Sequence, residues 1–415
     1  MQKKIIALAV AGLVSGVALA QSNVTVYGIA DVDYTWSQSK NNLAGHNDGY
    51  YRFSGIRDGV DNGLNGSRVG FKGEEALGNG LKSVFQIEFR VNAATGDQTQ
   101  ATRQSFLGLD SAAAGRFLIG RQYNASSDIY GNFSSNAVTT VMPVNSFQGT
   151  GGSTMVSQGG NSRESNVLKW ISPNWSGFTG RISYAFSNNA KAGSAGPYDP
   201  EASSYDNGRW STSLDYANGP LELGAAYNRT TSAYLTANGA TSGAAAYYGS
   251  NGGFATPLNN TDPFQGKPIN EWFLGAVYDF KVVKAIATYQ ELHAGTNAVL
   301  GVTDSKLWSL GASIPIGNGK LNLEYAKVDY SQDNNRNPVT RQDGGNKGFG
   351  IGYEYYFSKR TTGYAYYSQL KYDSNTATTN GAPSGVPVVG GGAAVGTAAP
   401  GETQNNVSIG LRHVF

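Results

Sequence analysis

The sequence predicts an all-β chain that closes into a 16-stranded antiparallel transmembrane β-barrel, with short turns at one end and long loops at the other. Three observations support this prediction. Apolar and polar residues alternate over many short segments, the links between these segments are short and long in turn, and the alternation continues to the final residue, Phe415. A period of two is the pattern of strands whose two faces meet different surroundings.

Alternation is clear from the first expected strand, residues 23–37. It places Val24 and Tyr34 on one face and Asp31 and Asp33 on the other. The clearest further segments are residues 178–187 and 349–357. The chain holds 56 glycines, 25 tyrosines and 17 phenylalanines, and such enrichment with short alternating segments is typical of a membrane barrel. No apolar run after residue 20 approaches the roughly 20 residues that a membrane-spanning helix needs.

The links between segments show a second regularity. The expected short links are residues 76–80, 111–115, 173–177, 217–220, 280–281, 317–319 and 358–360. The expected long links are residues 38–66, 93–101, 125–164, 189–207, 233–269, 295–304, 332–345 and 373–404. Together they give sixteen strands, an even number that returns the C-terminus to the end where the first strand begins. Short periplasmic turns and long extracellular loops match outer-membrane barrels. A soluble β-sandwich or lectin is the alternative, although neither needs this regular alternation.

Residues 1–20 have the features of a secretory signal peptide. Lys3 and Lys4 precede an apolar stretch, which ends in the small-residue sequence Ala18-Leu19-Ala20. A transmembrane anchor is the less favoured alternative, because the stretch is short and has no basic flank after it. We therefore expect cleavage before Gln21, export, and a mature chain of one barrel domain over residues 21–415.

Phe415 is expected to lie at the periplasmic rim of the barrel. Lipid offers no water to satisfy an open sheet edge, so the first and last strands must pair and the last strand should run to the end of the chain. An aromatic residue there also suits the interfacial girdle of a membrane barrel.

Charge and residue types exclude several functions. Once Lys3 and Lys4 are removed, the 31 basic residues fall to 29 and equal the 29 acidic ones, so no nucleic-acid partner is expected. The chain has no cysteine, which excludes thiol catalysis and cysteine-based zinc sites. None of the three histidines, His46, His293 and His413, lies in a catalytic motif. We expect no enzymatic activity, no metal and no cofactor.

Several motifs carry a family resemblance when they are taken in order. SRVGFKGEEALGNGLKSVFQIEF at 67–89, TRQSFLGLD at 102–110 and GRFLIGRQY at 115–123 resemble the early hairpins of the trimeric Gram-negative general porins, of the neisserial and betaproteobacterial type. The resemblance covers the whole mature chain. It implies a homotrimer among the lipids of the outer membrane of a Gram-negative bacterium, which passes small hydrophilic solutes and anions. It also implies that Phe415 is recognised by the barrel assembly machinery.

Strand alternation selects the basic residues that should face the lumen. If Val69 and Phe71 face lipid, Arg68 and Lys72 face inward, and the same argument on the next strand turns Arg90 inward. Arg103 is ambiguous, because Phe106 and Leu107 compete for the outer face of its strand. The resemblance places Arg68, Arg103 and Arg163 near the basic cluster of the porin constriction. The expected basic wall is Arg68, Lys72, Arg90, Arg103 and Arg163.

The third long link, residues 125–164, is the candidate constriction loop. A loop of this length without structure of its own is unusual unless it is functional or disordered, and the resemblance implies that it folds into the lumen. Its charges are few. The expected loop side of the narrowing is Asp128, Tyr130, Phe133 and Glu164.

The sequence therefore predicts a general diffusion channel with a moderate anion preference, because arginines outnumber acids at the expected narrowing. Pairing of Glu74, Glu88 and Glu164 with those arginines would weaken the preference. A substrate-specific channel is one alternative, and it would need an aromatic path along the lumen. Tyr356, Tyr367 and Phe273 are expected inward but are scattered. A plugged barrel that serves as an adhesin or structural protein is the other alternative.

Overall fold

The computed structural model describes residues 23–40, 50–59, 64–96, 102–133, 142–144, 163–186, 208–230, 269–293, 304–331, 344–373, 378–379, 382–383 and 401–415. The expected signal peptide, His46 and most residues of the expected long links lie outside these ranges, including residues 134–141 and 145–162 of the expected third loop. No helix within the described ranges is long and apolar enough to cross a membrane.

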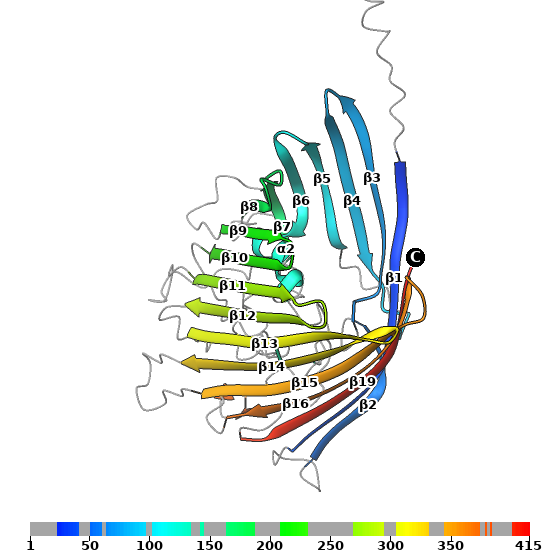
Figure 1. Ribbon diagram of the computed structural model, residues 1–415, viewed down its shortest axis with the longest axis vertical. Helices are drawn as coiled ribbons and strands as arrows, with labels where there is room; N and C mark the ends of the chain where they lie inside the picture. Colours follow the sequence, from blue (N-terminus) through cyan, green and yellow to red (C-terminus); the bar gives the residue numbers. More distant parts are fainter. Residues whose placement is uncertain are drawn as a thin grey trace, which may run out of the picture.

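One closed antiparallel sheet makes up almost all of the described chain. Its strands are β1 (Asn23–Lys40), β2 (Tyr50–Asp58), β3 (Arg68–Gly78), β4 (Leu81–Arg90), β5 (Thr102–Ser111), β6 (Gly115–Tyr123), β7 (Arg163–Ile171), β8 (Phe178–Ala185), β9 (Arg209–Asn218), β10 (Leu221–Thr230), β11 (Ile269–Asp279), β12 (Lys284–His293), β13 (Asp304–Ile316), β14 (Gly319–Ser331), β15 (Gly344–Tyr356), β16 (Thr361–Tyr372) and β19 (Thr403–Val414). From β3 to β16 each strand pairs with the next, as the colour order in Figure 1 shows. β19 pairs with β16 on one side and with β1 on the other, which closes the ring. A separate hairpin of β17 (Thr378–Thr379) and β18 (Ala382–Pro383) lies within the expected eighth loop.

The 17 strands of this sheet occupy sixteen positions around the barrel. β2 and β3 pair one after the other with the same edge of β1: β2 with residues 32–40 and β3 with residues 23–29. They are two halves of one barrel strand that is interrupted near its middle. The prediction of sixteen strands is confirmed, but the prediction that residues 38–66 are a continuous loop is wrong. Residues 50–58 pair with residues 32–40 of β1, where Ile56 lies opposite the outward-facing Tyr34 but Ser54 and Arg52 share its face. The segment is a strand because β1 offers it a free edge, and it lacks the apolar alternation that would have revealed it in the sequence.

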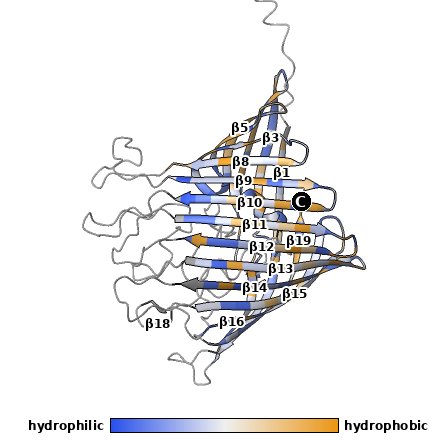
Figure 2. Cartoon of the chain, turned by 60° about the vertical axis from the view of Figure 1, so that its left-hand side comes forward, coloured by the Kyte–Doolittle hydropathy of each residue, from blue (hydrophilic) through white to orange (hydrophobic). Residues whose placement is uncertain are grey.

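Alternation along the strands separates a mainly apolar outer face from a mainly polar inner face, as expected. On β1, Val24 and Tyr34 are exposed on the outside, whereas Asp31 and Asp33 are buried. Figure 2 shows the same change between hydrophobic and hydrophilic residues along neighbouring strands. All seven expected short links join the strands predicted for them. In the first of these turns Gly78, Asn79 and Gly80 all have a positive φ, the region that glycine and asparagine adopt most readily.

The closing seam reaches the last residue. The Gly28 amide donates to the Phe415 carbonyl at 3.1 Å, and the Phe415 amide donates back to the Gly28 carbonyl at 3.1 Å. The Phe415 ring covers Gly28 so closely that a side chain at that position would collide with it. A glycine on the first strand thus leaves room for the aromatic end of the last strand.

Candidate pore constriction

The first described part of the third loop is a short helix inside the barrel. β6 ends at Tyr123, and α2 (Ala125–Tyr130) and the 3-10 helix η1 (Gly131–Phe133) follow directly. Asn124 caps α2, because its side-chain oxygen accepts a hydrogen bond from the Ser127 amide at 2.9 Å. α2 lies against β8, β9 and β10, and η1 lies against β11 and β12, so the loop turns inward along one side of the wall.

Small polar side chains of the wall hold the start of α2. The Ala125 amide donates to Ser183 Oγ at 3.0 Å, and the Ser213 hydroxyl donates to the Ala125 carbonyl at 2.7 Å. The Ser126 amide donates to Ser211 Oγ at 3.0 Å. These serines come from β8 and β9, where they alternate with outward residues. Main-chain groups at the helix N-terminus that lack a partner within the helix are thereby satisfied by the barrel.

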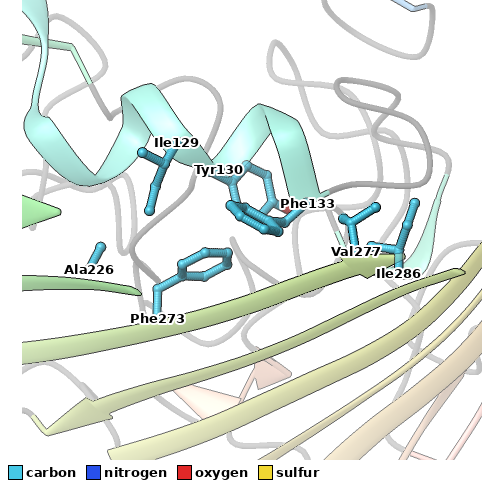
Figure 3. Packing of buried hydrophobic residues seen from close by; sticks show 7 residues of the cluster. All are labelled: Ile129, Tyr130, Phe133, Ala226, Phe273, Val277 and Ile286. Carbon is cyan, nitrogen blue, oxygen red and sulfur yellow. The ribbon is translucent and has the colours of Figure 1, made fainter. Parts of the chain in front are cut away.

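An apolar contact holds the end of the helical segment. The cluster contains Ile129, Tyr130, Phe133, Ala226, Phe273, Val277 and Ile286, all buried (Figure 3). The Phe133 ring rests on Gly224 and Gly275, which lie directly opposite each other on β10 and β11. Any side chain at either glycine would occupy the place of the ring. Two paired glycines therefore make a flat seat for Phe133 on the inner wall.

A second described part of the loop, residues 142–144, contacts a different part of the wall. The Val144 amide donates to Glu324 Oε1 on β14 at 2.7 Å. Met142 and Pro143 lie against Gly350 on β15. The third loop is thus attached inside the barrel both on the β8–β12 side and at β14 and β15, as expected for a loop folded into the lumen.

Three arginines converge on one glutamate and one tyrosine. Arg103 forms an ion pair with Glu88, and Arg68 Nη1 lies 3.7 Å from the same carboxylate oxygen. The Tyr123 hydroxyl accepts hydrogen bonds from Arg163 Nη1 at 2.8 Å and from Arg103 Nη2 at 3.3 Å. Arg68, Arg103, Arg163, Glu88 and Tyr123 are called the arginine cluster below. With three guanidinium groups and one carboxylate, it has a net positive charge.

A β-bulge explains why Arg103 joins the cluster. Leu107 and Leu109 face outward on β5, so strict alternation would turn Arg103 outward as well. The ladder between β4 and β5 shifts between Ile87 and Phe89, so that two residues of β5 oppose Glu88. A bulge of this kind reverses the faces beyond it and turns Arg103 inward. This resolves the ambiguity that the sequence leaves.

Arg90 and Lys72 flank the cluster on the same face of the wall. Arg90 lies directly opposite Arg68 in the ladder of β3 and β4 and is half-buried. Lys72 lies over the ring of Tyr27, with its ammonium nitrogen 5.2 Å from the ring centroid. The Tyr27 hydroxyl in turn donates to Glu88 at 3.1 Å. Both basic residues therefore line the inner face beside the three arginines.

The loop-side residues are placed differently from the expectation. Tyr130 and Phe133 are buried against the wall, so their side chains anchor the loop. Glu164 is also buried and pairs with Arg209 at 2.9 Å, which pairs with Glu271 at 2.6 Å. These residues lie beneath α2, where they are shielded from the open lumen.

Asp128 on α2 pairs with two cations of the wall. Its carboxylate lies 2.7 Å from Lys169 Nζ and 3.9 Å from Arg181 Nε. Burial raises the pKa of the Asp128 carboxyl, and the two cations oppose this rise. The negative charge of Asp128 is thus largely neutralised by Lys169 and Arg181.

Several members of the site were not selected from the sequence. Tyr123 directly precedes the third loop, and its hydroxyl role depends on Arg103 and Arg163, which are distant in sequence. Lys169 and Arg181 occupy inner positions of β7 and β8 that alternation could have identified. Tyr367, expected inward, lies on the outer face opposite Ile351, so that prediction is wrong. The inner positions of β16 are instead those of Tyr364, Tyr366 and their alternate neighbours.

Comparison with known proteins agrees with this architecture. Residues 7–375 match the Gram-negative porin family. The chain belongs to this family. It is a diffusion porin of the Gram-negative outer membrane, and the predictions of fold, family and location are confirmed. Porins are channels by family character.

This porin has relatives along its full length. It is 29% identical over 385 residues to an outer membrane porin protein of Bordetella pertussis, covering 89% of this chain and 94% of the relative. Outer membrane porin protein 32 of Delftia acidovorans is 28% identical over 422 residues, with 100% of both chains covered. Among solved structures, the anion-selective porin from Comamonas acidovorans superposes with a TM-score of 0.67 at 24% identity, covering 95% of this chain and 100% of that one.

Proposed function

We propose that this porin is a general diffusion channel with a moderate preference for small anions, and that the third loop, residues 125–164, forms its constriction together with the basic wall. The arginine cluster carries this proposal. Arg68 and Arg103 share a single glutamate, Glu88, and Arg163 is joined to them through the Tyr123 hydroxyl. Arg90 and Lys72 extend the basic surface. Rings of arginine or lysine favour anions in a narrow pore.

The acidic residues near the third loop also agree with a preference for anions, because each is paired with a basic residue. Asp128 is paired with Lys169 and Arg181, and Glu164 is paired with Arg209. Glu74, which could have opposed the cluster, pairs with Lys82 in an exposed position. An ion in the pore responds mainly to charges within a Debye length, about 8 Å at physiological ionic strength. The similar fold of the Comamonas porin, which is anion-selective, agrees with this assignment.

The remaining parts of the proposal concern assembly. We propose a homotrimer among outer-membrane lipids, exported by the signal peptide at residues 1–20, with Phe415 read by the barrel assembly machinery. A trimer form of a similarly folded outer membrane protein, OmpT of Vibrio cholerae, supports the oligomer; it is 18% identical with a TM-score of 0.58. No cofactor, metal or catalytic step enters the proposal, and the transported species are small hydrophilic solutes and ions.

Reversal potentials in planar bilayers test the selectivity. The purified porin is recorded in a tenfold salt gradient at low ionic strength, beside an Arg68→Ser and Arg103→Ser double variant. Loss of two positive charges should move the zero-current potential towards cation preference, because less positive charge remains near the ion path. Lys82→Ser is the control, since Lys82 pairs with Glu74 at an exposed site and should leave the potential nearly unchanged. A cation-selective wild type, or a double variant with the wild-type potential, contradicts the proposal.

A further inference from the structure

The interruption between β2 and β3 leaves no unsatisfied main-chain group at Asp31, the β1 residue opposite it. Opposite it on β1, the main chain of Asp31 has no strand partner on that edge, yet its groups are satisfied. The Gly59 amide donates to the Asp31 carbonyl at 2.8 Å. The Ser67 hydroxyl accepts from the Asp31 amide at 3.0 Å and donates to the Asp31 carbonyl at 3.1 Å. A serine hydroxyl thus takes the place of a missing ladder position.

The segment that returns to the wall, residues 64–67, lies on the lumen side of β1. The Asp31 carboxylate, on the inner face, accepts from the Asn65 amide at 2.7 Å and from the Tyr364 hydroxyl at 2.6 Å. Leu64 is only 2% exposed. Residues 64–67 are called the inner segment below, and Asp31 is its main anchor.

Two arginines of the inner wall are held by the inner segment. The Gly66 carbonyl accepts a hydrogen bond from Arg68 Nε at 3.0 Å. The Asn65 side-chain oxygen accepts from Arg412 Nη1 at 2.8 Å. Arg68 is therefore fixed from two directions, by Gly66 on one side and by Glu88, 3.7 Å from its Nη1, on the other. A guanidinium held at two places keeps its charge in one position relative to the pore.

We propose that the inner segment is a second narrowing element of the pore, which reduces the lumen beside β1 and positions Arg68 for selectivity. The part that concerns selectivity rests on the anion preference proposed above. The part that concerns width does not, because a chain segment on the inner face excludes neutral solutes as well as ions. Asp31, Asn65 and Ser67 act as positioning residues: they hold the segment, and the segment holds Arg68.

Asp31→Asn tests the proposal, with Asp33→Asn as the matched control. Both aspartates are buried on the inner face of β1, and each variant removes one carboxylate. Asp33 accepts hydrogen bonds from Thr35 and Ser408, and neither belongs to the inner segment. An asparagine at position 31 has one acceptor oxygen in place of two and no charge, so the bond from the Asn65 amide loses its charge assistance even when the Tyr364 hydroxyl turns to accept from the new amide group. Only the Asp31 variant should therefore loosen the inner segment.

Two measurements distinguish an effect on the width of the pore from an effect on the position of the Arg68 charge. In liposome swelling, Asp31→Asn should admit neutral sugars of a larger size than the wild type, whereas Asp33→Asn should keep the wild-type limit. In reversal-potential records both variants lose the same negative charge, so the difference between them reports on Arg68. If its charge moves from about 5 to about 8 Å from the ion path, the anion-to-cation permeability ratio falls about two- to threefold relative to Asp33→Asn.

The outcomes are distinct. Equal sugar limits and equal potentials in the two variants overturn the proposal. If Asp31→Asn admits larger sugars but the wild type has no anion preference, the inner segment remains a narrowing element and only the selectivity part of the proposal is rejected. Should Asp31→Asn fail to assemble, Ser67→Ala releases the same segment from its other end, with Ser67→Thr as the variant that keeps the hydroxyl. A wild-type sugar limit in assembled Ser67→Ala then counts against the proposal.

Discussion

Glu88→Gln should make the channel more anion-selective. Glu88 is the carboxylate that Arg68 and Arg103 share, and it is only 3% exposed. Glutamine keeps the shape of the side chain and an oxygen that can accept from Arg103, while its amide group can donate to the Tyr27 hydroxyl oxygen. The net charge of the arginine cluster rises by one unit while its geometry is largely retained. Arg103 also keeps its hydrogen bond to Tyr123.

The size of the effect follows from Coulomb's law. One unit charge acts on an ion about 8 Å away in water with about 0.5 kcal/mol. Because the change attracts anions and repels cations, the permeability ratio responds to about 1 kcal/mol, or about fivefold without screening. Screening over a Debye length of about 8 Å at physiological ionic strength reduces this to about twofold, and at about 0.01 M salt about fourfold remains.

The assay is the zero-current potential across a salt gradient, recorded at both ionic strengths. Glu74→Gln is the matched control, because it removes the same charge from an exposed residue that pairs with Lys82. The shift for Glu88→Gln should exceed that for Glu74→Gln and should grow as salt is lowered. Equal shifts in the two variants, or a shift independent of salt, would refute the placement of the arginine cluster at the narrowing. Glu88→Asp keeps the charge and should stay near the wild-type potential.

Two further predictions concern the loop and the closing seam. Phe133→Ala removes a fully buried ring, a loss that costs about 3–5 kcal/mol in a protein core. The third loop should therefore detach from Gly224 and Gly275, and single-channel records should become noisier. A current as steady as that of the wild type would contradict this anchoring. Phe415→Ser removes the ring that covers Gly28 and should lower the amount of barrel in the outer membrane, measured by surface labelling, more than it changes the conductance of assembled channels. Normal surface levels would show that neither the seam nor the assembly machinery needs the ring.

Much of the constriction depends on contacts that no local pattern contains. Glu164 pairs with Arg209, and Arg209 with Glu271, although long stretches of chain separate all three. Phe133 and Tyr130 look like aromatic residues available to a pore, yet they are buried because two paired glycines and Phe273 offer an apolar seat. Alternation predicts which wall residues face inward, but it cannot predict where the third loop docks.

The sequence by itself determined the barrel, its sixteen positions and the inward direction of Arg68, Lys72 and Arg90. Each of these follows from a period of two and from the order of short and long links, because strand edges must be paired in lipid and the outer face of the barrel must carry an apolar band. Only the tertiary structure decided the direction of Arg103, the division of the second barrel strand into β2 and β3, and the pairing of Glu88. A one-residue bulge opposite Glu88 reverses a face, and a serine hydroxyl at position 67 substitutes for a ladder bond. Both devices act between strands, so their cause lies in the neighbouring strand and not in the segment that carries the residue.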